Sequence, residues 1–184
     1  MRDPISQVQS SYQYIIQTPH NPQHELVKKL DGMEQFWDYQ VEQRRNNIQT
    51  RFLADAAPYF ARETGTKVTM TGKSGEECFA KAMNRLKEIE FVFLTENFDE
   101  ALLILEKGLE WPVSPSYQRL NESKRESDVS EETKSKILEV HEYDFLIYEE
   151  AQRRHQSRVS SMGSDFRERL NIFQERTQSP NIAS

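Results

Sequence analysis

Hydrophobic residues recur every three or four positions over most of this sequence, which is the spacing of helices that bury one face. Polar residues fill the positions between them. The pattern predicts helices at residues 4–16, 23–40, 76–88 and 98–109, a partly helical stretch at 46–62, and two further helices after residue 130 that are separated near 160–163.

The first of these helices has clear signals at both ends. Asp3 is a good N-cap residue, and Pro4 suits the first helical position because it lacks an N–H that would go unpaired there. The prolines within residues 18–22 stop the helix, since proline cannot donate the next hydrogen bond. We therefore expect a helix over residues 4–16.

One segment has the character of a strand. Residues 91–94 form a short continuous apolar run, as in a strand that is covered on both faces. Asn97 and Glu100 then have the spacing of a capping box at the start of the helix at 98–109. This unit predicts an α/β fold that is predominantly helical with few short strands. Because one strand is not a stable sheet, either something outside this pattern completes the sheet or the chain is the later part of a larger domain.

Composition excludes several classes of protein. The 184 residues carry 24 basic and 30 acidic side chains, and the formal net charge of -6 argues against a general nucleic-acid-binding protein. No apolar run approaches the roughly 20 residues of a membrane-spanning helix. Cys78 is the single cysteine, which excludes an internal disulfide and a cysteine-rich zinc site. His20 and His24 flank a turn sequence, so we expect no metal site there.

The start of the first helix is a candidate phosphate-binding segment. Arg2 can hold a phosphate in a bidentate fork, the helix N-terminus adds amide donors and a positive dipole, and Ser10 on the same helix offers a hydroxyl. The ordinary alternative is an arginine that precedes a capped helix, which fits any protein.

Two segments resemble those of sulfotransferases that use 3′-phosphoadenosine 5′-phosphosulfate (PAPS). Arg2-Asp3-Pro4 followed by Ser10 is similar to the 3′-phosphate-binding segment of these enzymes. Residues 90–105 resemble the strand-to-helix block of the galactose-3-O-sulfotransferase (galactosylceramide sulfotransferase-like) family. The same order continues through residues 109–111, Tyr117, residues 120–121, Asp144 and Tyr148, so the resemblance covers most of the chain.

The resemblance implies a P-loop sulfotransferase-type domain with short parallel strands. Residues 1–178 would be the C-terminal portion of that domain, and 179–184 a flexible tail. The enzyme would transfer a sulfuryl group from PAPS, its co-substrate, to a galactose hydroxyl of a glycolipid or glycan on the lumenal side of the Golgi membrane. Arg2 and Ser10 would contact the 3′-phosphate, no metal would take part, and the membrane would be reached only through an anchor that this chain lacks.

The resemblance also indicates what is missing. Met1 stands where the family has the end of the strand that leads into Arg-Asp-Pro, so the anchor, the loop around the 5′-phosphosulfate and the catalytic base would lie upstream. No catalytic residue can be named, and we expect the chain to be incomplete and inactive alone. The alternative is a non-catalytic, helix-rich binding or regulatory module that retains the second half of the fold.

Two further patterns have a functional and a structural interpretation. Gly72-Lys73-Ser74 is similar to the end of a phosphate-binding loop, but Lys67 occupies the position of its first glycine, which favours an exposed turn. Glu96, Asp99 and Glu100 could be acid–base carboxylates at the end of a strand, or could stabilise the N-terminus of a helix.

A basic run and a glycosylation triplet complete the candidates. Arg153, Arg154, His155 and Arg158 could meet an anionic sugar or lipid headgroup, or could be the solvated face of a helix balanced by neighbouring glutamates. Asn121 begins an Asn-Glu-Ser triplet, a candidate N-glycosylation site if the chain enters the secretory pathway.

Overall fold

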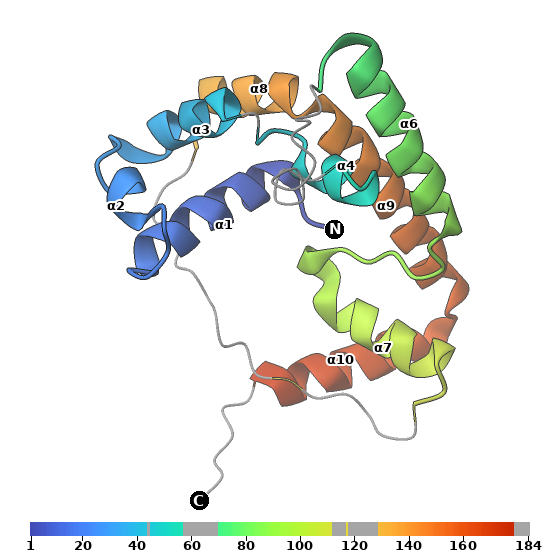
Figure 1. The fold of residues 1–184 in the computed structure, drawn as a ribbon. Coiled ribbons are helices and arrows are strands. Elements are labelled where there is room, and N and C mark those ends of the chain that lie inside the picture. The colour runs from blue at the N-terminus through green and yellow to red at the C-terminus, as the bar shows by residue number, and fades with distance from the viewer. Residues whose placement is uncertain (44, 57–69, 112–116, 118–128, 179–184) are drawn as a thin grey trace, which may run out of the picture. The chain divides into compact units, whose positions relative to one another are not determined.

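The computed structural model describes residues 1–43, 45–56, 70–111, 117 and 129–178. The chain divides into two compact units. Unit 1 comprises Met1, residues 91–122 and residues 150–184, and unit 2 comprises residues 2–90 and 123–149. The helices of both units are labelled in Figure 1.

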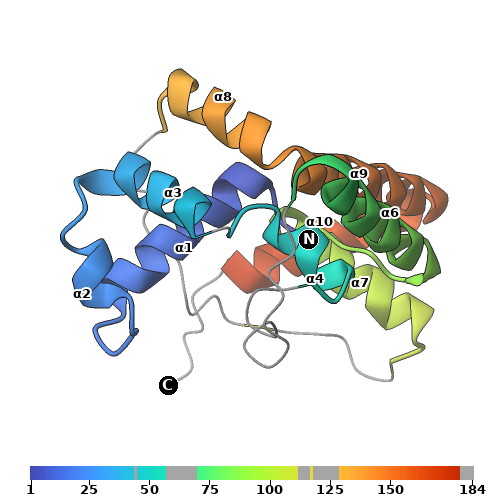
Figure 2. The ribbon, with the colours of Figure 1, turned by 45° about the horizontal axis from the view of Figure 1, so that its top comes forward.

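Unit 2 contains most of the described helices. They are α1 (Pro4–Gln17), α2 (His24–Val27), α3 (Gly32–Glu42), α4 (Ile48–Leu53), α6 (Gly72–Glu88), α8 (Glu131–Val140) and the start of α9 (Glu142–Ser161). α1 contacts α2, α3 and α8, and α4 contacts α6, which can be followed in Figures 1 and 2.

The prediction for α1 is confirmed. The Asp3 carboxylate accepts a hydrogen bond from the Ser6 N–H at 2.7 Å, and Pro4 occupies the first helical position. The helix ends at Gln17, directly before the proline-containing turn. Local signals at both ends therefore place this helix correctly.

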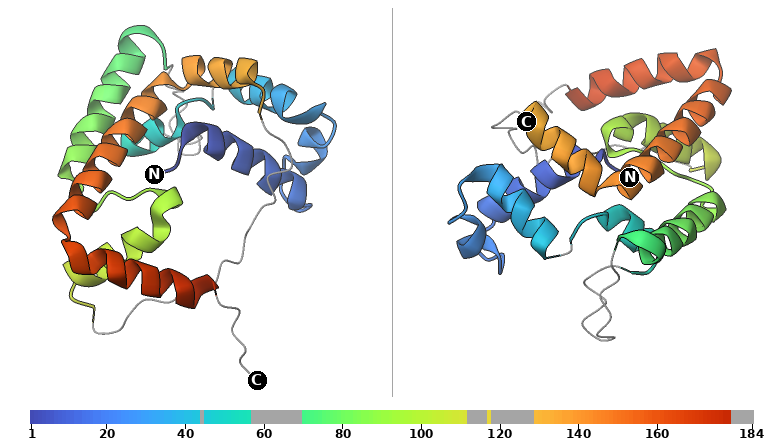
Figure 3. Two further views of the ribbon diagram at one scale, coloured as in Figure 1. Left: turned by 180° about the vertical axis from the view of Figure 1, so that it is seen from behind. Right: turned by 90° about the horizontal axis from the view of Figure 1, so that it is seen from above.

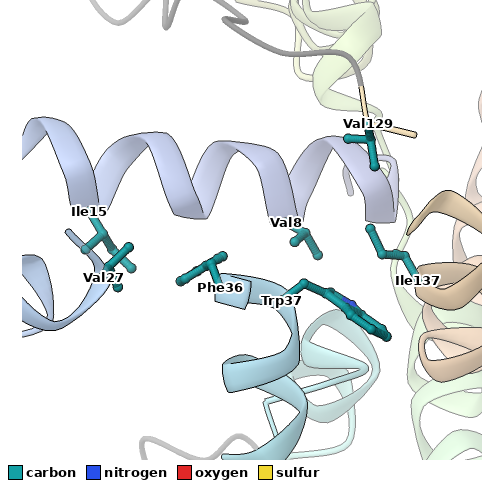
Figure 4. Packing of buried hydrophobic residues seen from close by; sticks show 7 residues of the cluster. All are labelled: Val8, Ile15, Val27, Phe36, Trp37, Val129 and Ile137. Carbon is teal, nitrogen blue, oxygen red and sulfur yellow. The ribbon is translucent and has the colours of Figure 1, made fainter. Parts of the chain in front are cut away.

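The core of unit 2 lies where α1, α3 and α8 meet. Val8 and Ile15 come from α1, Phe36 and Trp37 from α3, and Ile137 from α8. Figure 4 shows Val8 and Ile15 on the side of α1 that faces Phe36, which is completely buried. Val8 and Ile15 lie two helical turns apart, so the helical spacing read from the sequence identifies the buried face.

Several predicted helices have different boundaries in the structure. The helix expected at 23–40 is divided into α2 and α3, because Gly32 takes a φ of +83° that a continuous helix does not allow. The long helix expected after residue 130 is two helices, α8 and α9, which meet at His141. α6 begins at Gly72 rather than Glu76. The stretch expected to be partly helical yields α4, and residues 57–69 lie outside the described residues.

Unit 1 is built from η1 (Thr95–Asn97), α7 (Phe98–Gly108), the rest of α9 and α10 (Ser164–Gln178). α7 and α10 contact each other, as Figure 3 shows. Leu103 and Ile104 of α7 pack with Phe166 and Phe173 of α10. The predicted break between the last two helices is confirmed, since Gly163 has a φ of +84° there.

The strand predicted at residues 91–94 is wrong. These residues form no strand, and the described part of the chain contains none. Their apolar character comes from burial against helices: Val92 and Leu94 are buried, and Phe91 and Phe93 pack on the α7–α10 core. The fold of the described residues is predominantly helical, as predicted, but the expected α/β sheet is not formed.

A single residue pairs with this segment. The Met1 nitrogen donates to the Phe93 carbonyl oxygen at 2.8 Å, and the Met1 carbonyl oxygen accepts from the Thr95 N–H at 2.8 Å. In a parallel strand pair, a residue forms hydrogen bonds with the residues on either side of its partner. Here Met1 is that residue and Leu94 is its partner. A pairing one residue long does not make a strand, and no sheet forms among the described residues.

Candidate functional site

The main chain of Arg2 is held by one side chain. The Arg2 N–H donates to Gln49 Oε1 at 2.9 Å, and Gln49 Nε2 donates to the Arg2 carbonyl oxygen at 2.8 Å. Gln49 therefore satisfies both backbone groups of Arg2 and fixes the direction in which the arginine side chain leaves the chain. The Arg2 guanidinium makes no hydrogen bond or ion pair with a described residue.

Gln49 is positioned in turn by a buried carboxylate. It lies in the first turn of α4, where Asp144 accepts from the Gln49 N–H at 3.2 Å and from the Thr50 N–H at 2.7 Å. The Thr50 hydroxyl donates to the same carboxylate at 2.7 Å. Asp144 belongs to α9 and is completely buried, so a residue distant in sequence caps α4.

Asn47 in turn caps the N-terminus of α9. Its Oδ1 accepts from the Asp144 N–H at 3.0 Å, and its Nδ2 donates to the Val140 carbonyl oxygen at 2.9 Å. Asn47 has a left-handed backbone, with a φ of +51°, which aims its side chain at α9. The Asn47 N–H donates to His141 Nδ1 at 3.3 Å. Two helix N-termini thus cap each other, in a buried network that ends at Arg2 through Gln49.

Ser10 lies on the same helix that Arg2 precedes. It is half-buried, and no hydrogen bond joins it to Arg2. Helical rise places its Cα about 9 Å along the axis from that of Pro4. Because helical side chains lean towards the N-terminus, the hydroxyl is directed to the end at which Arg2 lies. Ser10 nevertheless lies midway along α1, so the two predicted site residues neither share one end of the helix nor touch.

The N-terminus of α1 offers less to an anion than its sequence suggests. Asp3 takes the Ser6 N–H with its carboxylate and the Gln7 N–H with its carbonyl oxygen, at 2.8 Å in the second case. Pro4 has no N–H to offer. Fewer open helix amides than expected therefore remain at this end, because the Ser6 N–H is taken by Asp3 and Pro4 has none.

Asp99 and Glu100 lie in the first turn of α7, as predicted, and both also bond to residues elsewhere in the chain. Asp99 accepts hydrogen bonds from the Tyr117 hydroxyl and from Gln174 Nε2, the second at 3.3 Å. Glu100 Oε2 lies 2.6 Å from His155 Nε2. α7 has no side-chain cap bond, so the predicted capping box is wrong. Asp99 and Glu100 tie α7 to α10 and α9 within unit 1, and Glu96, the third carboxylate of this group, is exposed on η1.

Two basic patterns have ion-pair partners in the structure. Gly72, Lys73 and Ser74 form the first turn of α6 rather than an exposed turn before it, and Lys73 is exposed and faces Glu77 at 3.8 Å. Arg153 is an exposed residue that pairs with Glu150 at 2.7 Å, as predicted for a solvated helix face. His155 departs from that prediction because it is buried against Glu100. Lys67, Asn121 and the tail at 179–184 lie outside the described residues.

Sequence analysis missed the residues that hold Arg2. Gln49, Thr50 and Asn47 carry no recognisable motif, and Asp144 belongs only to the pattern that it shares with Tyr148. The one signal that could have found the network is the position of Asp144, a charged residue where the helical period calls for an apolar one.

Comparisons with protein-family models, with curated proteins and with solved structures gave no match for this chain. No helix among the described residues has the length and apolar character needed to cross a membrane. Among the same residues, no group of three or more His, Cys, Asp and Glu side chains is arranged to hold a metal ion. Arg2, Ser10 and the network that holds Arg2 are therefore the candidate site of this chain.

Proposed function

We propose that this chain carries the 3′-phosphate-binding part of a PAPS-dependent sulfotransferase. The reaction is the transfer of a sulfuryl group to a galactose hydroxyl of a glycolipid or glycan. Arg2 and Ser10 contact the 3′-phosphate of the nucleotide. The galactosyl acceptor and the lumenal Golgi location rest on the sequence resemblance alone.

The state of Arg2 is the observation that carries this proposal. Its main chain is fixed on both sides by Gln49, while its guanidinium makes no hydrogen bond or ion pair with a described residue. An arginine whose backbone is held and whose side chain is unpaired is prepared to bind an anion, because less conformational entropy is lost when the fork closes on a phosphate.

The chemistry of transfer sets a limit on what this chain does alone. Sulfuryl transfer needs in-line positioning, stabilisation of charge on the leaving phosphate oxygen, and a base for the acceptor hydroxyl. Asp99 and Glu100 are engaged with Tyr117 and His155, so they are poor candidates for the base. We expect the chain to bind the nucleotide product without turnover of PAPS.

The test is titration of the chain with adenosine 3′,5′-bisphosphate by isothermal titration calorimetry. Arg2→Ala should weaken binding about tenfold or more, because a charge-assisted bidentate pair is lost. Ser10→Ala should weaken it less, about threefold, through loss of one neutral hydrogen bond. Arg167→Ala is the matched control, since Arg167 is an exposed arginine on α10.

The alternative function is a non-catalytic, helix-rich binding or regulatory module. The engagement of Asp99 and Glu100 in tertiary contacts favours it. Absence of bisphosphate binding by the wild-type chain, or equal affinities for the Arg2→Ala and Arg167→Ala variants, would contradict the sulfotransferase proposal and leave the module.

A further inference from the structure

A cavity of about 280 Å³ lies in unit 2 beside α1, α3 and α4. Its apolar lining includes Val8 and Ile15 from α1 and Phe36 from α3, all of them buried, and Figure 4 shows these three side chains together. Ile48 and Phe52 of α4 complete the apolar lining. An aromatic or aliphatic body would fit against this wall.

A histidine offers a hydrogen-bond donor to the cavity. His141 lines it and is only 4% exposed. Because His141 Nδ1 accepts from the Asn47 N–H at 3.3 Å, the neutral ring carries its proton on Nε2. That N–H has no hydrogen-bond partner among the described residues. An acceptor group on a ligand in the cavity would pair with this N–H.

A cation lines the same cavity. Arg45 is half-buried, and its backbone N–H donates to the Gln40 carbonyl oxygen at 2.9 Å, which fixes the turn after α3. Its guanidinium makes no hydrogen bond or ion pair with a described residue. Arg45 and His141 therefore both present N–H groups to one space.

The polar lining has one sign of charge. None of the described residues that line the cavity is acidic, although the chain as a whole has a formal net charge of -6. The other polar contributors are neutral, such as Gln7, Gln40 and Ser11. A low-dielectric wall with one guanidinium and no carboxylate favours an anion over a cation or a neutral polar molecule.

We propose that this cavity binds a small amphipathic organic anion. Its apolar body lies against Val8, Ile15 and Phe36, and its sulfonate, sulfate or carboxylate group pairs with Arg45 and accepts the His141 N–H. The volume is at the lower end of the range for ligand pockets, so the ligand is of one- or two-ring size. The site is separate from Arg2 and Ser10 and does not depend on the proposed sulfotransferase function.

Two isosteric probes test this site: naphthalene-2-sulfonate and its neutral analogue naphthalene-2-sulfonamide. In calorimetric titrations, Arg45→Gln should reduce affinity for the sulfonate about tenfold and leave affinity for the sulfonamide unchanged. Arg167→Gln, at an exposed position on α10, is the matched control and should change neither. No binding of the sulfonate to wild type, or an equal effect of both substitutions, overturns the proposal.

A second variant blocks the cavity without changing charge. Ser11 lines the cavity from an exposed position of α1, so Ser11→Phe should fill the entrance and abolish binding of both probes. Gln17→Phe adds the same bulk at an exposed position of α1 outside the cavity and should leave binding intact. Unchanged binding in Ser11→Phe places the probe elsewhere and overturns the proposal.

The last comparison separates this cavity from the end of α1. Arg2→Ala should leave the affinity for naphthalene-2-sulfonate unchanged, since Arg2 does not line the cavity. A loss in Arg2→Ala as large as that in Arg45→Gln would mean that the sulfonate binds near Arg2, and would overturn the proposal while leaving the phosphate-binding proposal standing.

Discussion

Single buried polar residues determine the surroundings of Arg2. Asp144 is completely buried and receives three hydrogen bonds from the first turn of α4, two from backbone N–H groups and one from the Thr50 hydroxyl. A buried carboxylate is stabilised when it accepts several hydrogen bonds. The same buried donors would cost free energy if they had no acceptor. Stability of unit 2 and the placement of Gln49 therefore depend on the same side chain.

Substitution of Asp144 by alanine should destabilise the protein by about 3 kcal/mol, because three donors, two of them buried, lose their acceptor. Urea denaturation followed by circular dichroism measures the free energy of unfolding. Glu142→Ala is the control, an exposed acidic residue in the same helical turn, with an expected effect within about 0.5 kcal/mol. Similar values for the two variants would show that Asp144 does not cap α4.

The reactivity of Cys78 reports on local burial. Cys78 is 7% exposed, and burial raises the pKa of its thiol. The raised pKa keeps the thiol protonated at pH 8. The rate of modification by iodoacetamide should therefore be at least about tenfold lower in the native protein than in the urea-unfolded chain. Since the unfolded thiol ionises at lower pH, stability should fall as pH rises through the ordinary thiol range. Equal modification rates in both states would contradict the burial of Cys78.

At the scale of the element, α1 depends on its cap. Asp3→Ala should cost about 1 kcal/mol of stability, because the Ser6 N–H loses its acceptor and no side chain replaces it. Asp3→Asn is the matched control and should cost little, since asparagine is an equally good N-cap residue. Thermal unfolding of both variants compares them, and an Asn variant as unstable as the Ala variant would show that charge rather than capping matters.

Elements with local signals could be predicted from the sequence, and those that depend on distant partners could not. α1 follows from Asp3, Pro4 and the prolines after it, and the break at Gly163 follows from composition. The segment at 91–94 has the local pattern of a strand, but apolar residues in a row also suit an extended stretch buried against helices. Its capping box failed for the same reason, because Glu100 bonds to His155 instead.

The candidate site shows the same division at the scale of the whole molecule. Arg2 and Ser10 could be named from their spacing and the family resemblance, whereas the residues that hold Arg2 come from α4 and α9 and leave no pattern in the sequence. The cavity beside Arg45 and His141 could not be predicted from the sequence either, because side chains on several helices form it. Contacts between residues on helices that are distant in sequence can be identified only in the folded structure.

Side-by-side titration of the chain with adenosine 3′,5′-bisphosphate and adenosine 5′-phosphate tests the role of Arg2 most directly. The two ligands differ only in the 3′-phosphate. If Arg2 and Ser10 bind that group, the bisphosphate will bind about tenfold or more tightly in the wild-type chain, and Arg2→Ala will remove the preference. Equal affinities in the wild type, or a preference that survives in Arg2→Ala, would contradict the proposed 3′-phosphate site.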